Sequence, residues 1–128
     1  MDLPWNPELK AVAEKLYAHC EAHTELQGLD ELYAADAVSV EALAMGDMGA
    51  EAAGLDAIKG KHAWWNETME VHGGEMKGPY LHGDDRFAIW FQVDATDKTT
   101  GERNLMTEIG VYTVKSGKIV REEFYYAL

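Results

Sequence analysis

The sequence predicts an α+β fold in which three helices come first and pack on one face of a mainly antiparallel sheet. Apolar residues recur every three or four positions in the first half of the chain, which is the spacing of helix faces, and they alternate with polar residues after residue 86. Clusters of Gly, Asp, Lys and Thr separate the alternating stretches, as they do between antiparallel strands. Helices and strands that are segregated along the chain in this way are typical of α+β architecture.

The chain fits a single domain that spans residues 1–128. It is 47% hydrophobic and contains four Trp, six Tyr and three Phe, which is enough for one core without disulfide bonds. No linker rich in Pro, Gly or Ser and no block of like charges divides it. A second domain is therefore not expected.

The first helix is expected to begin at Asn6-Pro7-Glu8. Asn caps free amides, Pro is pre-organised for the first helical position, and Glu complements the helix dipole. An apolar stripe with helical spacing follows, and we expect Gly28 to end the helix. The stripe consists of Leu9, Val12, Ala13, Leu16, Tyr17 and Cys20. A second, short helix is predicted over Leu29–Tyr33.

The third helix is expected to present one apolar face that contains a single imidazole. This face consists of Leu55, Ile58, His62, Trp65 and Met69. Upstream of it, Val38–Leu43 is predicted as a strand. Ala44–Leu55 is rich in small residues and has no clear period, so we interpret it as a loop or lid. Its composition fits an ordered lid and a mobile loop equally well.

Four strands in a meander are predicted from His72 onward. The expected turns are Gly73-Gly74, Gly83-Asp84-Asp85, residues 97–101 and residues 115–118. The three clearest strands between these turns are Arg86–Asp94, Leu105–Thr113 and Ile119–Ala127. These strands supply most of the predicted sheet.

The alternation within these strands predicts which side chains face the core, because the more apolar set is expected to point inward. The inward sets are Phe87, Ile89, Phe91 and Val93, then Leu105, Thr107, Ile109 and Val111, then Val120, Glu122, Phe124 and Tyr126. The opposite face would carry Trp90, Tyr112 and Tyr125. A monomer seldom exposes such an aromatic patch, so we predict a homodimer that pairs through it.

The charge balance argues against several classes of partner. The net charge of −12 repels phosphate backbones and anionic lipid, and the basic residues are scattered. No apolar run approaches the length of a membrane span, and the first residues lack the features of a signal peptide. We therefore expect no nucleic-acid partner and no membrane association.

The cysteine and histidine content bears on compartment, metals and cofactors. Cys20 is the only cysteine, so no internal disulfide can form, and a reducing cytoplasm is expected. His19, His23, His62, His72 and His82 show no tight metal-ligand spacing such as H-E-x-x-H. Phosphate-binding loops and the G-x-S-x-G nucleophile motif are also missing from the sequence. We expect neither a metal nor a cofactor.

Two segments carry a resemblance to a known superfamily. They are Leu29–Val38, which reads LDELYAADAV, and Val111–Phe124, which reads VYTVKSGKIVREEF. With the order of elements, they resemble the nuclear transport factor 2-like superfamily, which includes ketosteroid isomerases and SnoaL-like polyketide cyclases. The resemblance implies a cone-shaped fold with three N-terminal helices on a curved, mainly antiparallel sheet. It implies no single function, because the superfamily includes both enzymes and binding modules.

The resemblance to ketosteroid isomerases points to two site residues. A Tyr on the first helix and an acid on the first strand serve that active site, and the corresponding positions here are Tyr17 and Glu41. A carboxylate can remove a proton next to a carbonyl, and a phenol can stabilise the resulting enolate. The second oxyanion donor of that family falls on Ile109, which donates no hydrogen bond. The alternation places Glu108 on the opposite face, so steroid isomerisation is not expected.

The remaining candidates line the expected pocket. His62 is the one titratable side chain on its predicted helix face and can act as an acid, a base or a ligand-orienting group. Glu122 is a second pocket acid, and its alternative role is a salt bridge to a base at the rim, such as Arg103 or Lys61. The expected walls are Leu32, Ile58, Trp65, Met69, Ile109, Phe124 and Tyr126.

Two functions follow from these candidates. One is a cofactor-free isomerase or cyclase that acts on a small, largely apolar carbonyl compound, with Glu41 transferring the proton and Tyr17 or His62 stabilising charge. The other is a non-catalytic module that binds a small hydrophobic molecule or a protein. Each of Glu41, Tyr17 and His62 also has a purely structural interpretation: a solvated carboxylate, a core aromatic and a hydrogen-bonded core histidine.

Overall fold

The computed structural model describes residues 6–44 and 48–127. Its elements run in the order α1 (Pro7–Ala22), α2 (Glu25–Leu32), β1 (Tyr33–Val40), β2 (Glu51–Ala53), α3 (Leu55–Thr68), β3 (Met69–His82), β4 (Arg86–Asp97), β5 (Arg103–Lys115) and β6 (Lys118–Tyr125). The six-stranded sheet has the order β2-β1-β6-β5-β4-β3. All neighbouring strands are antiparallel except β1 and β6, which are parallel. The predicted α+β class is confirmed.

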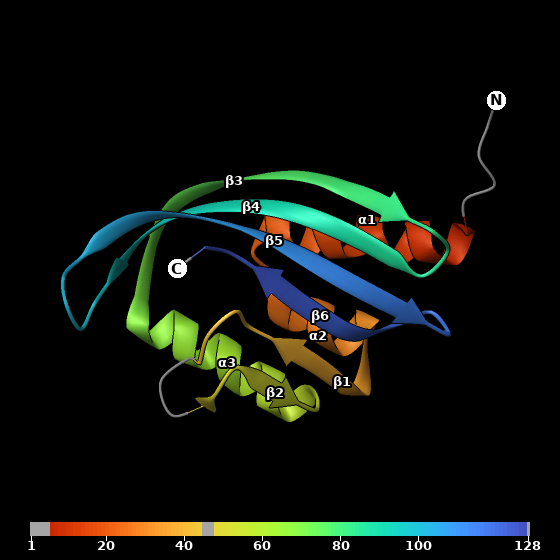
Figure 1. Ribbon diagram of the computed structural model, residues 1–128, viewed down its shortest axis with the longest axis horizontal. Helices are drawn as coiled ribbons and strands as arrows, with labels where there is room; N and C mark the ends of the chain where they lie inside the picture. Colours follow the sequence, from red (N-terminus) through yellow and green to blue (C-terminus); the bar gives the residue numbers. More distant parts are fainter. Residues whose placement is uncertain (1–5, 45–47, 128) are drawn as a thin grey trace.

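The sheet is strongly curved, and the helices lie on its concave side (Figure 1). α1 runs beneath β3 and β4, while α3 lies beside β1 and β2 at the other end of the sheet. We call the concave side the inner face and the convex side the outer face. This arrangement confirms the cone-shaped fold that the resemblance implies.

The helix boundaries agree with the sequence at the start of α1 and differ at its end. The Asn6 side chain accepts hydrogen bonds from the amides of Glu8 and Leu9, as predicted. The helix ends at Ala22, because His23 adopts the left-handed conformation with a φ of 58°. Gly28 does not end it and lies inside α2, where an added Cβ would meet the His19 side chain at 3.2 Å. The glycine therefore permits close packing of the two helices.

The region between the second and third helices contains more strand than the sequence predicts. α2 ends at Leu32, so the predicted helix over Leu29–Tyr33 overlaps only its last turn, and Tyr33 already begins β1. The predicted loop over Ala44–Leu55 contains the short strand β2, which pairs with β1. Residues 45–47 of that loop lie outside the described residues.

The strand β3 also runs further than predicted. Gly73-Gly74 is not a turn, because β3 continues through it and pairs with β4 along nearly its whole length, with a register shift between Val71 and Gly73. An added Cβ on Gly74 would lie 2.5 Å from the Gln92 carbonyl oxygen. Glycine is needed here because the two backbones approach closely, which sequence patterning cannot distinguish from a turn.

The two faces of β4 are as predicted, and the two faces of β5 are reversed. β4 and β5 pair without a register shift, so Phe87 lies opposite Tyr112 and Trp90 lies opposite Ile109. The Phe87 and Tyr112 rings stack on the inner face with centroids 4.8 Å apart, and Tyr112 is 2% exposed. Ile109 is 43% exposed on the outer face. The predictions of an inward Ile109 and an outward Tyr112 are therefore wrong.

The core lies between the inner face and the helices. Its buried residues include Leu9, Val12, Leu16, Leu29, Leu32, Ile58, Phe87, Ile89, Tyr112 and Ile119. The stripe predicted for α1 is part of this core. No helix within the described ranges is long and apolar enough to cross a membrane.

Candidate functional site

The clearest polar site on the inner face is centred on Lys61 of α3. Its ammonium donates a hydrogen bond to the Ser39 hydroxyl oxygen at 2.6 Å and lies 3.0 Å from Oε2 of Glu41. It also lies 4.8 Å from the centroid of the Phe124 ring, within the range of a cation–π contact. The Lys61 and Glu41 side chains are only 12% and 11% exposed. A charged pair is therefore held largely away from water.

Helix and strand periodicity explain why these residues meet. Lys61 follows the fully buried Ile58 by three positions and precedes Trp65 by four, so it lies on the inward side of α3. Ser39 is in β1, and Glu41 directly follows that strand, two residues after Ser39, so the two side chains point to the same side. Phe124 lies on the inner face of β6, opposite Gly110. The site therefore joins one helix to two neighbouring strands.

A second acid, Glu122 of β6, is buried next to this site. It is 3% exposed and accepts a hydrogen bond from the Tyr33 hydroxyl. Burial raises the pKa of the Glu122 carboxyl, and hydrogen bonds from Tyr33 and Ser39 oppose that rise. Tyr33 is itself buried, and its pKa is raised by burial and by the Glu122 charge. This pair forms a closed polar link between β1 and β6.

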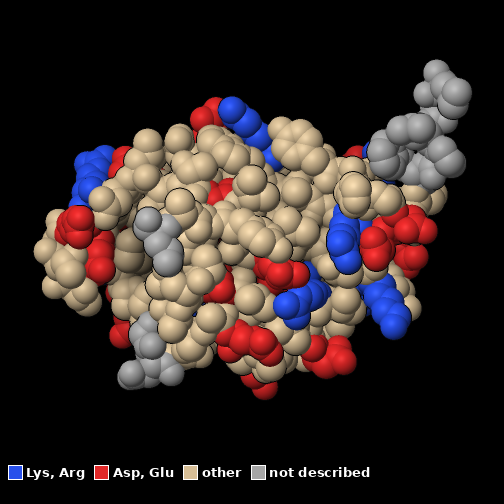
Figure 2. Space-filling view, in the orientation of Figure 1, with Lys and Arg blue, Asp and Glu red and all other residues tan. Residues whose placement is uncertain are grey.

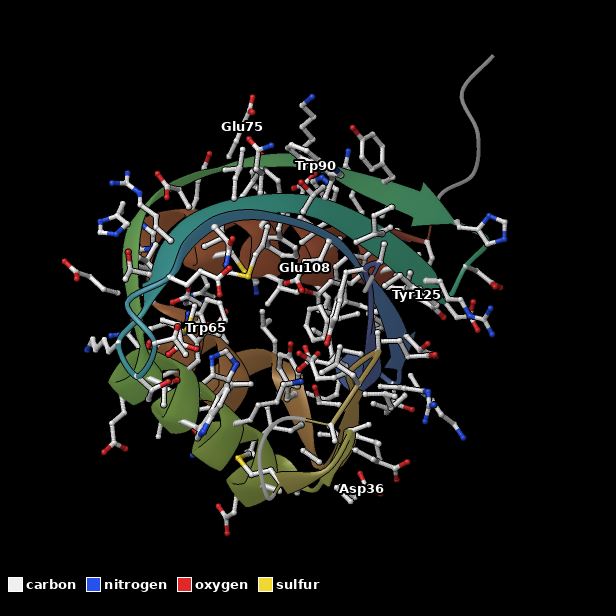
Figure 3. All side chains as sticks on the ribbon, turned by 60° about the vertical axis from the view of Figure 1, so that its left-hand side comes forward. Asp36, Trp65, Glu75, Trp90, Glu108 and Tyr125 are labelled. Carbon is white, nitrogen blue, oxygen red and sulfur yellow. The ribbon has the colours of Figure 1, made fainter. Side chains whose placement is uncertain are left out.

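The third acid is Glu108 of β5. It lies on the concave side of the sheet, whereas Trp90 and Glu75 stand on the convex side (Figure 3). Burial, together with the charges of Glu41 and Glu122, raises the pKa of Glu108 to about 7, although Lys61 acts in the opposite direction. A carboxyl with this pKa exchanges its proton readily near neutral pH.

We call Glu41, Glu108 and Glu122 the acidic cluster. Burial also raises the pKa of Glu41, although the charge of Lys61 lowers it. The charges of Glu41 and Glu122 each raise the pKa of Glu108. Three acids thus share one ammonium in a poorly hydrated region, which favours the protonated form of at least one of them.

Of the three predicted catalytic residues, Glu41 pairs with Lys61. His62 is the next residue after Lys61 on α3 and forms no hydrogen bond or ion pair with another described residue. Burial and the Lys61 charge lower the pKa of His62, which favours its neutral imidazole. Tyr17 packs at the edge of the core and forms no hydrogen bond with the acidic cluster within the described ranges.

The predicted wall residues fall into three groups. Leu32 and Ile58 are closed into the core at 4% and 0% exposure. Trp65, Met69, Phe124 and Tyr126 are partly buried. Ile109 lies on the outer face, where it lines a hollow of about 390 Å³ with Lys77, Tyr80, Ala88 and Trp90. It is therefore not a wall of the inner site.

Sequence reasoning named Lys61 only as a possible salt-bridge partner of Glu122, assigned Glu108 to the opposite face and missed the Tyr33 hydroxyl. Lys61 could have been found, because its spacing from Ile58 and Trp65 puts it on the same helix stripe. Glu108 was assigned to the outer face because its alternating set is the less apolar one. The available signal was Gly110, which lies in the same alternating set as Glu108, because a glycine within a strand often marks a close approach. In the structure an added Cβ on Gly110 would meet Tyr112 and Phe124 at 2.8–3.1 Å, so the set that contains Glu108 faces a crowded interior.

We also searched the described residues for a metal site and for other hollows. No group of three His, Cys, Asp or Glu residues in the described part of the chain is arranged to hold a metal ion. A second hollow lies beside β2 and α3, and no residue of the acidic cluster lines it. On the face shown in Figure 2, Lys and Arg are scattered among Asp and Glu.

Comparisons with known proteins agree with the fold. A model described as the SnoaL-like domain matches residues 9–126. A structure from Mesorhizobium loti, described as a candidate SnoaL-like polyketide cyclase and carbohydrate phosphatase, is 42% identical, and the match covers 91% of this chain and 97% of that one with a TM-score of 0.85. No curated protein matches.

Two more distant structures share the fold. A nuclear transport factor 2-like protein from Burkholderia thailandensis is 18% identical, with coverage of 91% and 88% of the two chains and a TM-score of 0.76. A Catenulispora acidiphila protein with a ketosteroid isomerase-like fold, in complex with trimethylamine, is 22% identical, with coverage of 91% and 85% and a TM-score of 0.70. The family match spans nearly the whole described chain, and this protein therefore belongs to the SnoaL-like family.

Proposed function

We propose that this protein is a cofactor-free enzyme of the isomerase or cyclase type, which moves a proton on a small, largely apolar carbonyl compound bound against the inner face. The observation that carries the proposal is the position of Glu108. It is a partly buried carboxyl among other acids, with a pKa of about 7. Structural carboxylates at a protein surface rarely have such a pKa, whereas acid–base catalysts commonly do.

Glu108 is better suited to the role of base than Glu41, which the sequence favours. The Lys61 ammonium stabilises the charged form of Glu41 and weakens it as a base. Glu122 is closed off by Tyr33. Glu108 combines partial exposure with a poised proton, so it alone in the acidic cluster meets both requirements.

The surroundings support an apolar substrate. Trp65, Met69, Phe124 and Tyr126 retain partial exposure, and such side chains bind carbon skeletons well. The Phe124 ring lies 4.8 Å from the Lys61 ammonium. The proposed reaction breaks a C–H bond next to the carbonyl. The proton passes to the Glu108 carboxylate, and the electron pair moves into the carbonyl to form an enolate. In a substrate with a neighbouring C=C bond the enolate is conjugated, and return of the proton at its far carbon gives an isomer.

Hydrogen–deuterium exchange tests this proposal without knowledge of the natural substrate. Small cyclic ketones and β-diketones are incubated with the protein in D2O, and loss of the α-proton signal is followed by NMR. Acceleration over buffer is expected, with a rate that rises as Glu108 loses its proton near pH 7. Glu108→Gln should lower the enzymatic rate by about 10²-fold or more.

The matched control is Glu123→Gln, which removes a carboxylate from the outer face of β6, where it pairs with Arg121. This variant should exchange like the wild type. Equal rates for wild type and Glu108→Gln contradict the proposal. Ketones that bind without accelerated exchange would favour the alternative of a non-catalytic binding module.

We further propose that two copies pair through the outer face. Apolar side chains are exposed along this side of the sheet: Tyr80 at 57%, Leu105 at 65%, Ile109 at 43% and Tyr125 at 53%. Burying them against a second copy would remove this surface from water. Light scattering should give the mass of a dimer for the wild type and of a monomer for Ile109→Lys. A wild-type monomer at high concentration would contradict the pairing.

A further inference from the structure

Lys61 has a donor capacity that its protein contacts do not use. An ammonium group has three N–H donors, and only the Ser39 hydroxyl receives a well-directed hydrogen bond from it. Oε2 of Glu41 is buried and lies 3.0 Å away, yet it receives no aligned hydrogen bond. The remaining contact within the described residues is the Phe124 ring face, which is a weaker partner than an oxygen.

The placement of Lys61 is costly unless something offsets the cost. Its side chain is 12% exposed, and removing a charge from water without complete pairing is unfavourable. Its charge affects the pKa of four titratable groups: Glu41, Glu108, Glu122 and His62. An apolar side chain of similar length would pack at this helix position without that cost. The charge itself is therefore the feature to be explained.

We infer that the Lys61 ammonium binds the carbonyl oxygen of the substrate and stabilises the negative charge that develops there, with Ser39 and Glu41 as its positioning residues. This inference rests on the proposed function and adds the substrate class, a compound whose oxygen becomes anionic. When the substrate C–H bond breaks, Glu108 takes the proton and the electron pair moves to the oxygen. Lys61 stabilises that oxygen by charge and hydrogen bonding and keeps all its own protons.

The geometry suits this task better than a role in proton transfer. The ammonium contacts Ser39, which is in β1, and Glu41, which directly follows β1. It also contacts the ring of Phe124, which is in β6. A substrate oxygen can replace the ring as the partner of an N–H donor. A donor fixed in advance in a poorly hydrated site stabilises a developing oxyanion more than water does.

The probe for this inference is 4-nitrophenol, whose neutral and ionised forms absorb at different wavelengths. Its ionisation is measured free and bound over a range of pH, with wild-type protein and with Glu108→Gln. Lys61 should lower the pKa of the bound phenol by about one unit, a tenfold change in its ionisation constant. The shift should persist in Glu108→Gln, because the oxyanion site does not need the base.

The decisive variant is Lys61→Met combined with Glu41→Gln, which removes both charges of the pair and avoids leaving one of them buried alone. It should bind the phenol without lowering its pKa. Lys59→Met is the matched control, since Lys59 lies two residues earlier on α3 and pairs with Asp30 on the surface at 2.6 Å. It should keep the full shift, and urea unfolding checks that each variant is folded.

Three results would overturn the inference. They are a wild-type protein that binds the phenol without shifting its pKa, a double variant that keeps the shift, and a folded wild type that binds no phenol. None of them decides whether Glu108 transfers protons, because that question is answered by deuterium exchange. A failed inference with successful exchange would leave Glu108 as the base and remove Lys61 from the substrate contacts.

Discussion

The inner face of the sheet buries charged groups beside its apolar core, whereas the outer face exposes apolar side chains. The buried charged groups include Glu122, which is 3% exposed, and the Lys61–Glu41 pair. The exposed apolar groups on the outer face include Leu105 at 65% and Tyr125 at 53%. Burying charge and exposing apolar surface both cost free energy. These two features indicate that each face has a task besides holding the fold together.

The two faces also tolerate change differently. The inner groups depend on one another, since Lys61 contacts Ser39, Glu41 and Phe124, and Glu122 is bonded to Tyr33. The outer apolar side chains Leu105 and Ile109 are largely exposed, at 65% and 43%. Substitutions on the inner face should therefore change stability strongly and non-additively, and those on the outer face should change it little.

The largest effect is expected for Lys61→Met alone. The substitution leaves Glu41 buried without its counter-charge and should lower the free energy of unfolding by about 3–4 kcal/mol. Adding Glu41→Gln should restore most of that loss. Urea unfolding of wild type, both single variants and the double variant measures the coupling, and additive losses would show that the pair does not act as a unit.

The next effect is the pH dependence that Glu108 contributes. Its pKa is about 7 in the folded protein against an ordinary value of 4.5, so between these values the folded state binds more protons than the unfolded state. The contribution of Glu108 to stability therefore falls as pH rises through this window, by about 3 kcal/mol. Glu108→Gln should show a smaller fall between pH 5 and pH 8 in urea unfolding. An unchanged pH dependence would place Glu108 in contact with water.

A smaller loss is expected when the inner face is overfilled. In Gly110→Ala the new methyl group would meet the Tyr112 hydroxyl at 2.8 Å and Phe124 at 3.1 Å, which should cost about 2 kcal/mol. The matched control is Gly60→Ala on α3, where nothing lies within 4 Å and the helix should gain about 0.5–1 kcal/mol. Thermal unfolding of both variants checks the opposite signs.

The smallest effect is expected on the outer face. Leu105→Lys replaces a side chain that is 65% exposed, so the stability of the monomer should change by no more than about 0.5 kcal/mol. Unfolding is measured at low protein concentration, where the proposed dimer is dissociated. A loss comparable to that of Gly110→Ala would mean that the outer face supports the fold of one protomer.

Local sequence patterns predicted most of the elements and part of the site. The cap at Asn6, the stripe on α1 and the start of α3 follow from interactions within a few residues, and the structure has all three. Glu41 was proposed from the resemblance to ketosteroid isomerases, whereas His62 and Glu122 were proposed because each is a titratable residue in an apolar pattern. Gly28 and Gly73-Gly74 were misassigned as breaks, because close packing and turns both select glycine.

The sequence by itself determined the α+β class, the order of the elements and the alternation of each strand, because these depend on local spacing and backbone preference. Only the tertiary structure decided which face of β5 turns inward, because the choice depends on what Glu108, Gly110 and Tyr112 meet across the sheet. The alternation of a strand shows that its two sets of side chains face opposite ways. It does not show which set is buried when the interior includes polar groups and the exterior includes apolar ones.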